Sequence, residues 1–340
     1  MPATGEMRMP SPDLFFQTAR AYQGTAAIKA AINLDIFRAI GEGATTAAEI
    51  GRRAGASERG TRILCDFLVI LGFLTKVDGK YALTADSAAF LDPRSPMCIA
   101  AAANFLCDPR LTGMVDSLTD AVRKGGTAMP DGGTTKPEND IWVKFAESMA
   151  PMMSMTAGAL ASALGETAAR ARKVLDIAAG HGMFGITLAH RNPQMKMVGL
   201  DWAPVLEVAK RNAKKAGVAD RYSTIDGSAF DVDFGSGYDL ILLPNFLHHF
   251  RAEVNTDLLK KVHAALAPGG HAAIVEFVPN DDRVTPPEAA SFALTMLSST
   301  PEGDAFTFRE LEQMCRNGGF SAAKIQPLAP SPESLIVADR

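Results

Sequence analysis

The segment from Lys173 to Gly185 carries the residues best suited to chemistry in this chain. Its apolar run, Asp176 and three glycines are typical of a buried strand, a tight turn and the start of a helix. A second apolar run, Met195 to Leu200, follows and ends in Asp201. The pattern predicts a strand–helix–strand unit with a carboxylate at the tip of each strand.

The two acids indicate which ligand approaches the glycine turn. Gly180, Gly182 and Gly185 match the dinucleotide-binding pattern, with Asp201 positioned to hold a ribose hydroxyl. Asp176 would repel a pyrophosphate resting on the following helix N-terminus, but it would attract a cation. S-adenosyl-L-methionine carries an ammonium, a sulfonium and a ribose, and it has no phosphate. The sequence therefore favours this methyl donor over a nicotinamide or a flavin, and over a turn that binds nothing.

The bulk composition is typical of a globular protein long enough for two domains. The chain has 340 residues, 47% hydrophobic and 21% charged, with a net charge of −4. No overall basic field draws it to nucleic acid or to a membrane surface, and no stretch approaches the roughly 20 apolar residues of a membrane helix. The four cysteines lack paired or zinc spacing. We therefore expect a cytoplasmic protein with reduced thiols.

The N-terminal region reads as a winged-helix domain over residues 13–100. Residues 13–40 have apolar side chains at helical spacing, and further helices are expected from Thr45 and from Ser57. Residues 73–83 read as strand, Asp-Gly turn and strand. Few basic residues lie near the third helix, so we interpret the domain as a homodimerisation module, and nucleic-acid binding is not expected.

Two further regions complete the predicted organisation. Residues 101–165 should form a helical connector, interrupted by a glycine- and proline-rich loop at residues 124–140. Residues 166–340 alternate strands with helices and end in a hairpin. The predicted fold class is therefore α/β: a Rossmann-like, doubly wound sheet with a terminal antiparallel hairpin, preceded by a mostly α winged-helix domain. A ligand should lie beyond the carboxyl ends of the strands.

Several motifs follow one another in a specific order along the chain. They are the winged-helix module, the turn from Asp176 to Gly185, Leu200-Asp201-Trp202, Leu247-His248-His249-Phe250, Leu266 to Gly270, and Glu276. Together they resemble the class I S-adenosylmethionine-dependent methyltransferases, and more narrowly the caffeate, acetylserotonin and hydroxyindole O-methyltransferases with their bacterial relatives. The resemblance covers nearly the whole chain. It implies a methyltransferase domain over residues 166–340 and a homodimer formed through the N-terminal domain.

The resemblance also implies a set of cofactor-binding residues. Gly180 and Gly182 would pass under the methionine part of the cofactor, with Asp176 close to its amino group, and Asp201 would bind the ribose hydroxyls. The other expected cofactor residues are Trp202, Ser228, Ala229, Phe230 and Asn245. Relatives often have Asp-Met where this chain has Ser228-Ala229, so a serine hydroxyl would replace the usual carboxylate contact to adenine more weakly.

His248 takes the position of the general base in similar enzymes. An imidazole with a pKa near ~6.5 accepts a hydroxyl proton at neutral pH, and Glu276 at the end of the next strand would orient it. His249 replaces an aspartate of the family motif and is expected to face another way. A second glutamate of the family is missing, with Asp304 as the nearest acid. His248, His249 and Glu276 lack the spacing of a metal site, and no metal is expected.

The acceptor is expected to be a small, mostly uncharged aromatic molecule. Two helices wall the acceptor site in the family, and here both are apolar, without a cluster of Arg or Lys that would suit a phosphorylated acceptor. The same residue types also fit an ordinary hydrophobic core. The expected substrate residues are Trp142, Phe145, Met149, Met152, Phe292 and Met296. The sequence does not identify the acceptor itself.

Three functions remain open at this point. The first is methyl transfer to a hydroxyl, with His248 as base. The second is methyl transfer to an activated carbon of a keto acid or similar molecule, since one base serves both reactions. The third is a regulator that senses S-adenosylmethionine and binds DNA through the winged helix. The His248–Glu276 pair and the sparse basic residues argue against this third function.

Overall fold

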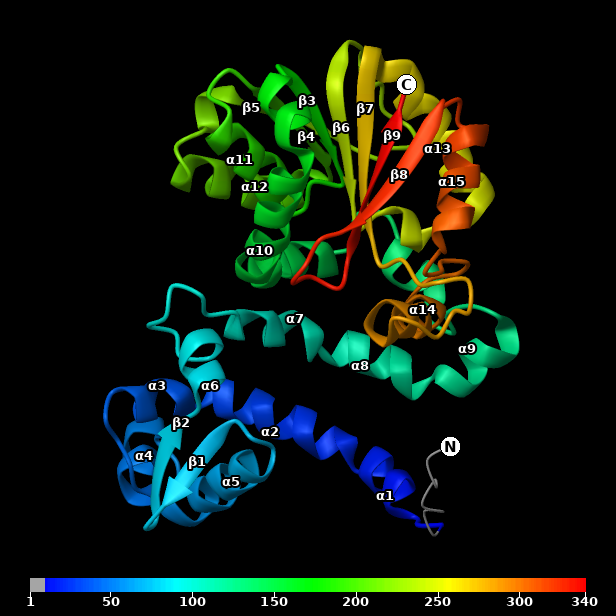
Figure 1. The fold of residues 1–340 in the computed structure, drawn as a ribbon. Helices are drawn as coiled ribbons and strands as arrows, with labels where there is room; N and C mark the ends of the chain where they lie inside the picture. The colour runs from blue at the N-terminus through cyan, green and yellow to red at the C-terminus, as the bar shows by residue number, and fades with distance from the viewer. Residues whose placement is uncertain (1–9) are drawn as a thin grey trace, which may run out of the picture. The chain divides into compact units, whose positions relative to one another are not determined.

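The computed structural model describes residues 10–340 (Figure 1). The chain forms two compact units that divide between Ala103 and Asn104. Among the described residues, no helix is both long enough and apolar enough to cross a bilayer.

The first unit consists of helices followed by a two-stranded hairpin. Thr46 caps one helix in a capping box with Glu49, Ser57 caps the next, and Asp78-Gly79 turns the hairpin with positive φ angles at both residues. Ile36, Phe37, Ile50, Leu68 and Tyr81 form its core. The elements are α1 (Asp13–Ala19), α2 (Ala21–Asn33), α3 (Ile36–Gly41), α4 (Ala47–Ala54), α5 (Glu58–Ile70), β1 (Leu74–Val77), β2 (Lys80–Leu83), α6 (Ala85–Phe90) and η1 (Ala100–Ala102).

The second unit is built around a seven-stranded sheet in the order β5-β4-β3-β6-β7-β9-β8. The first five of these are parallel, and β9 is antiparallel to both of its neighbours. The strands are β3 (Lys173–Ile177), β4 (Lys196–Asp201), β5 (Tyr222–Asp226), β6 (Tyr238–Pro244), β7 (Leu266–Glu276), β8 (Ala322–Pro327) and β9 (Ser334–Asp339). This is the predicted α/β fold with a terminal antiparallel hairpin.

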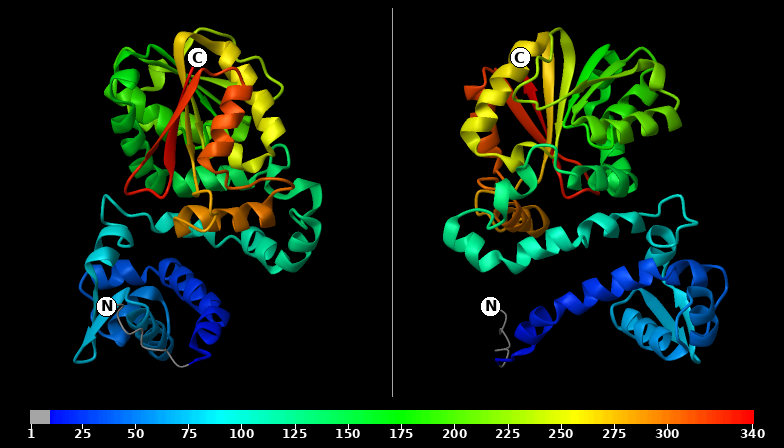
Figure 2. Two further views of the ribbon diagram at one scale, coloured as in Figure 1. Left: turned by 45° about the vertical axis from the view of Figure 1, so that its right-hand side comes forward. Right: turned by 180° about the vertical axis from the view of Figure 1, so that it is seen from behind.

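Helices cover both faces of the sheet. Figures 1 and 2 show α10, α11 and α12 on one face and α13 and α15 on the other. The central strands β3 and β6 are buried on both sides and therefore read as continuous apolar runs. These helices are α10 (Ile141–Arg170), α11 (Met183–Arg191), α12 (Ala203–Lys215), α13 (Ala252–Ala265) and α15 (Phe308–Asn317).

A third group of helices lies beyond one end of the sheet. Here α14 packs against α8, α9 and the short η2 turn (Figure 1). The elements of this group are α7 (Ala103–Leu106), α8 (Pro109–Asp116), α9 (Leu118–Lys124), η2 (Pro130–Thr135) and α14 (Pro287–Ser299), with the turns η3 (Ala219–Arg221) and η4 (Leu247–His249) elsewhere in the unit.

Two elements of the second unit contain a local irregularity. Strand β7 begins at Leu266, and its pairing with β6 shifts register between Tyr238 and Leu240, close to Gly269 with its φ of +76°. Helix α10 extends beyond the expected end of the connector at residue 165 to Arg170, and its helical dihedrals break at Gly165, where φ is +44°.

Candidate active site

The glycine turn joins β3 to α11 and brings two chain segments unusually close. Gly180 and Gly182 have φ angles of 57° and 74°, in the left-handed region that favours glycine. A Cβ on Gly185 would lie 2.5 Å from the terminal methyl of Met197 and 3.1 Å from Oδ2 of Asp176. The first two glycines therefore shape the turn, and the third lets α11 pack onto the sheet.

Asp176 is completely buried beneath this turn. Its Oδ2 accepts a 3.2 Å hydrogen bond from the amide of Gly185, whereas Oδ1 has no partner among the described residues. Burial, reinforced by the nearby charge of Asp201, raises the pKa of the Asp176 carboxyl to about 8. A buried acid with one unused oxygen fits a ligand that brings a positive charge and hydrogen-bond donors.

Asp201 at the end of β4 binds the turn from its other side. Its Oδ2 accepts a 2.8 Å bond from the Gly180 amide, and its Oδ1 accepts a 2.7 Å bond from the amide of Trp202. Burial raises the pKa of this carboxyl to about 6. Each oxygen retains a further lone pair, so the carboxylate can also accept from a ribose hydroxyl.

The loop after β5 holds the residues expected near the adenine. The hydroxyl oxygen of Ser228 accepts a 3.2 Å hydrogen bond from the amide of Phe230, so it already has a partner within the loop. Lys261 fixes the loop by donating to the carbonyls of Ala229, Phe230 and Val232 at 3.1, 3.1 and 2.5 Å. The ring of Phe230 packs edge-on against Phe250, with 4.8 Å between centroids. These contacts therefore restrain the loop.

His248 and Glu276 form a buried pair at the ends of β6 and β7. The Nδ1 atom of His248 lies 2.5 Å from Oε2 of Glu276. The other oxygen, Oε1, accepts from the backbone amides of Phe246, Leu247 and His248 at 3.1, 2.8 and 3.3 Å. With a carboxylate as its partner, Nδ1 carries the hydrogen and Nε2 presents a lone pair. One glutamate thus sets both the path of the loop and the tautomer of the imidazole.

The ring of His249 lies beside that of His248, so the expectation that it faces another way is wrong. The two ring centroids are 4.3 Å apart, because both residues belong to the tight η4 turn. Nδ1 of His249 lies 3.2 Å from the carbonyl oxygen of Phe246. Burial, followed by the neighbouring His248, lowers the pKa of His249 well below its usual value. This second imidazole is therefore neutral at physiological pH.

An unbroken series of aromatic ring contacts runs from the glycine turn to the His248 pair. Successive centroid distances are 5.8, 5.7, 5.2, 4.3, 4.8 and 4.1 Å. The rings, in order, belong to His181, Phe145, Trp142, His249, His248, Phe292 and Phe277. We call these seven rings the aromatic wall. It contains three of the predicted substrate residues, Trp142, Phe145 and Phe292. Met149 and Met296 are buried, and Met152 is half-buried.

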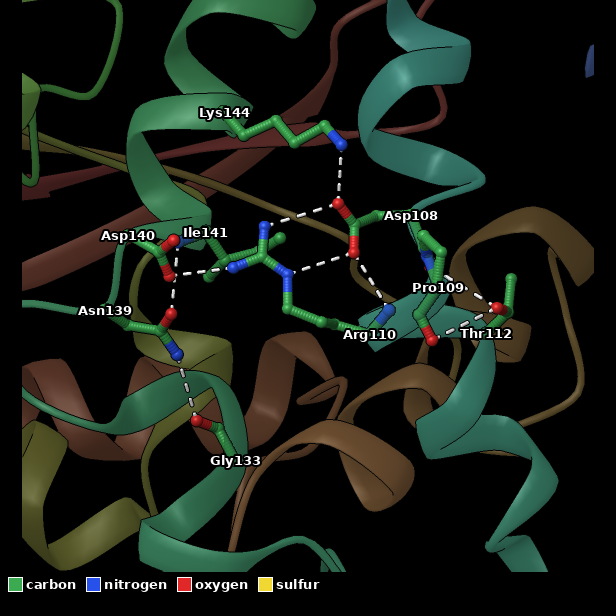
Figure 3. Close-up of polar contacts among 9 residues, drawn as sticks. All are labelled: Asp108, Pro109, Arg110, Thr112, Gly133, Asn139, Asp140, Ile141 and Lys144. Carbon is green, nitrogen blue, oxygen red and sulfur yellow. Dashed lines mark hydrogen bonds and ion pairs between the residues drawn. The ribbon is translucent and has the colours of Figure 1, made fainter.

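Polar contacts fix the start of α10, which carries part of this wall. The indole Nε1 of Trp142 donates to the carbonyl of Thr134 at 3.0 Å. Figure 3 shows the buried Asp108 between Arg110 and Lys144, at 3.0 and 2.6 Å. Arg110 continues to Asp140 at 2.7 Å. These bonds link α8 to α10, and the Arg110 guanidinium holds the pKa of Asp108 far below its usual range.

Asp304 does not orient the imidazole through its carboxylate. That group pairs with Arg283 at 3.2 Å and is partly exposed. The backbone amide of Asp304 instead donates to the carbonyl of His248 at 3.0 Å. Among residues 10–340, no group of three or more His, Cys, Asp or Glu side chains is arranged to hold a metal ion.

Sequence reasoning missed two buried polar residues near this edge of the sheet. The hydroxyl of Tyr222 is buried without a partner among the described residues, and a Cβ on Gly199 would come within 2.4 Å of it. Glu333 is buried in the terminal hairpin and bonds to Asn245 at 2.6 Å. Neither residue belongs to a motif, so nothing local in the sequence indicates its surroundings.

Comparisons with known proteins agree with this geometry. The chain matches the model of the O-methyltransferase domain over residues 116–321 and that of the O-methyltransferase dimerisation domain over residues 16–93. A solved structure from Nostoc punctiforme PCC 73102, described provisionally as an O-methyltransferase, has a TM-score of 0.95 and 50% identity. The similarity covers 98% of this chain and all of that one.

Two curated relatives are similar over most of their lengths. The 3-hydroxy-5-methyl-1-naphthoate 3-O-methyltransferase of Streptomyces sahachiroi is 27% identical, over 96% of this chain and 94% of its own. The L-tyrosine C(3)-methyltransferase of Streptomyces lavendulae is 24% identical, over 92% of this chain and 88% of its own.

Proposed function

Because the chain belongs to the O-methyltransferase family, whose members depend on S-adenosylmethionine, we propose that it methylates a hydroxyl of a small aromatic acceptor with His248 as general base. The observation that carries the proposal is the buried His248–Glu276 pair, with Nδ1 occupied at 2.5 Å. Its position beside a wall of aromatic rings supports a flat acceptor. The relative that acts on a hydroxynaphthoate supports the same class of acceptor.

The residues divide the task between proton transfer and positioning. His248 takes the hydroxyl proton at Nε2, which makes the acceptor oxygen a better nucleophile. Glu276 stabilises the imidazolium that results and prevents the ring from turning. Trp142, Phe145 and Phe292 hold the acceptor ring and exclude water, so that its oxygen is correctly aligned.

The residues at the strand ends fit the cofactor, on three observations. Gly180 and Gly182 bend the chain closely, Asp176 retains an unused buried oxygen, and Asn245 does the same. When bound, S-adenosylmethionine supplies an activated methyl group on a sulfonium. We assign the methionine part to Asp176 and Asn245 and the ribose to Asp201. We assign the adenine to the remaining expected cofactor residues, Trp202, Ser228, Ala229 and Phe230.

The direct test is a screen for release of S-adenosylhomocysteine. Phenols, hydroxynaphthoates, flavonoids and hydroxyindoles form one set of acceptors, and keto acids form the other. We expect turnover with at least one aromatic hydroxyl compound and a methyl ether as the product. Turnover only with phosphorylated or strongly charged acceptors would contradict the proposal, because the wall offers them no cation.

A second candidate, methyl transfer to carbon, is favoured by one relative. The L-tyrosine C(3)-methyltransferase aligns over most of this chain. A base at His248 can remove the proton of a phenol and thereby activate its ring carbon as well as its oxygen. Product analysis with methyl-labelled cofactor separates the two reactions, because an ether and a methylated ring differ in carbon chemical shift.

A further inference from the structure

A buried carboxylate in the terminal hairpin contacts the end of β6. Glu333 lies directly before β9 and is 2% exposed. Its Oε2 accepts hydrogen bonds from the hydroxyls of Thr156, at 3.0 Å, and Ser331. Its Oε1 accepts a 2.6 Å bond from Nδ2 of Asn245. Oε2 therefore links the hairpin to α10 through Thr156, and Oε1 accepts from Asn245.

Glu333 decides which way the Asn245 amide points. An ionised carboxylate only accepts hydrogen bonds, so the NH₂ end of the amide must face it and the Oδ1 end must face away. That Oδ1 is buried and has no partner among the described residues. The backbone N–H of Asn245 cannot donate to this Oδ1, because it donates to the carbonyl of Val275 at 2.8 Å. A buried acceptor without a donor is costly unless a ligand supplies one.

The position of Asn245 places this acceptor beside the glycine turn. In the parallel pairing of β3 and β6, Asp176 is opposite Leu242. Asn245 directly follows β6, as the glycine turn follows β3, so both lie at the carboxyl ends of adjacent strands. Neighbouring strands are about 4.8 Å apart. Asp176 also has a buried oxygen without a partner among the described residues. The same sheet edge thus presents two unused acceptors on adjacent strands.

We propose that Glu333 is a positioning residue that turns the Asn245 amide so that its Oδ1 accepts a hydrogen bond from the ammonium of the bound cofactor. The inference rests on the cofactor site proposed above. Glu333 does not touch the cofactor itself. Its effect is confined to the methionine end, because the ribose and adenine are assigned to Asp201 and to the loop after β5.

The test compares two ligands that share adenosine but differ in the ammonium. S-adenosylhomocysteine has the amino acid, and 5′-methylthioadenosine lacks it. We expect Glu333→Ala to weaken S-adenosylhomocysteine about tenfold by calorimetry, and to leave 5′-methylthioadenosine within about twofold. Glu333→Gln should restore most of the affinity, because its amide oxygen can still accept from Asn245. An equal loss for both ligands, or no loss for either, would overturn the proposal.

Further variants separate positioning from a structural tie. Ser331→Ala removes a hydrogen bond to Oε2 and leaves the Oε1–Asn245 contact in place. The ratio of the two affinities should therefore remain that of the wild type, and the ratio seen in Glu333→Ala would refute a specific role for Oε1. Asn245→Gly suits the φ of 54° and should lose as much affinity for S-adenosylhomocysteine as Glu333→Ala. The double variant should lose no more than Asn245→Gly alone.

A final variant distinguishes this inference from the site on which it rests. Asp201→Ala should weaken both ligands, since both contain the ribose. If it weakens neither, the cofactor site itself is wrongly assigned. If it weakens both while Glu333→Ala changes neither, only the positioning role of Glu333 is refuted.

Discussion

At the scale of single residues, buried carboxylates organise the candidate site. Glu276 accepts hydrogen bonds from three backbone amides of the loop after β6 and contacts His248. One side chain thus fixes both the path of this loop and the tautomer of the imidazole. Asp176 accepts from the amide of Gly185 and Asp201 from that of Gly180, so the two carboxylates bond to the two ends of the glycine turn. Burial raises the pKa of both, and a bound cation would lower it again. The neutral His249 adds a second imidazole without adding charge.

Replacing the proposed base tests the reaction at this scale. We expect His248→Ala to lower turnover about a hundredfold or more, because acid–base catalysis supplies an effect of this size. The affinity for S-adenosylmethionine, measured by calorimetry, should change little. His249→Ala is the matched comparison: it removes the neighbouring ring but leaves the Glu276 contact of His248, so turnover should fall less than in His248→Ala. Unchanged turnover in His248→Ala would exclude this residue from the mechanism.

Asp176 gives the protein without cofactor a pH-dependent stability. Its pKa is about 8 in the folded chain and near 3.8 when unfolded, so the folded state binds the proton more tightly. The contribution of Asp176 to the free energy of unfolding is fully present below about pH 4 and is lost as the pH rises through 8. Asp201 contributes in the same direction up to about pH 6.

Thermal unfolding between pH 5 and 9 should reveal this dependence. We expect Asp176→Asn, which keeps the side-chain shape without the charge, to be more stable than the wild type near pH 8.5 and to bind S-adenosylmethionine more weakly. Identical pH profiles for the two proteins would contradict the raised pKa of Asp176. Saturating S-adenosylmethionine should flatten the wild-type profile, because its ammonium compensates the carboxylate.

At the scale of elements, short polar links hold together the helices that carry part of the aromatic wall. Asp108, which caps α8, bonds to Lys144 in α10, and Thr127 and Thr134 donate hydrogen bonds to carbonyls at the end of α14. Trp142, Phe145 and Phe292 lie on helices, which keep their spacing, while these links fix the helices relative to one another. Loss of a link should therefore affect both stability and acceptor alignment.

The Asp108 cluster of Figure 3 provides the test at this scale. Asp108→Ala removes a helix cap and leaves Arg110 and Lys144 without their buried partner, so we expect a loss of about 1–3 kcal/mol in unfolding free energy. Urea denaturation measures it. Asp140→Ala is the control, because that carboxylate is 83% exposed and its pair with Arg110 should contribute little. Equal losses in the two variants would show that burial of Asp108 is unimportant.

At the scale of the whole molecule, the first unit leaves large apolar side chains exposed. Leu14, Phe15 and Tyr22, on α1 and α2, are 75%, 68% and 68% exposed. Such a patch is typical of a protein–protein interface, and the match to the O-methyltransferase dimerisation domain covers it in part. We propose that this surface is buried in a homodimer.

Introducing a charge into this patch tests the proposed dimer. We expect Phe15→Glu to shift the protein from dimer to monomer, measured by light scattering during size-exclusion chromatography, because an unpaired carboxylate would be buried at the interface. Gln313→Glu, an exposed site on α15, adds the same charge elsewhere and should leave the mass unchanged. A wild-type protein that is monomeric at micromolar concentration would refute the proposed interface.

The sequence by itself determined the order of the elements and the edge of the sheet at which the candidate site residues lie. Local signals were sufficient for this: the capping box at Thr46, the glycine turn after Asp176, and acids at strand ends are features of short segments. Parallel strands then bring their carboxyl ends to a single edge, so these residues converge without further information.

Only the tertiary structure decided which distant side chains meet there. The bond of Glu333 to Asn245 spans 88 positions of the chain, the Tyr222 ring lies under Gly199 on the next strand, and Asp108 contacts Lys144 across a loop. The adjacent rings of His248 and His249 follow from a tight turn that hydrophobic periodicity does not predict. Such contacts depend on how elements pack, and a pattern within one segment carries no record of what another segment places against it.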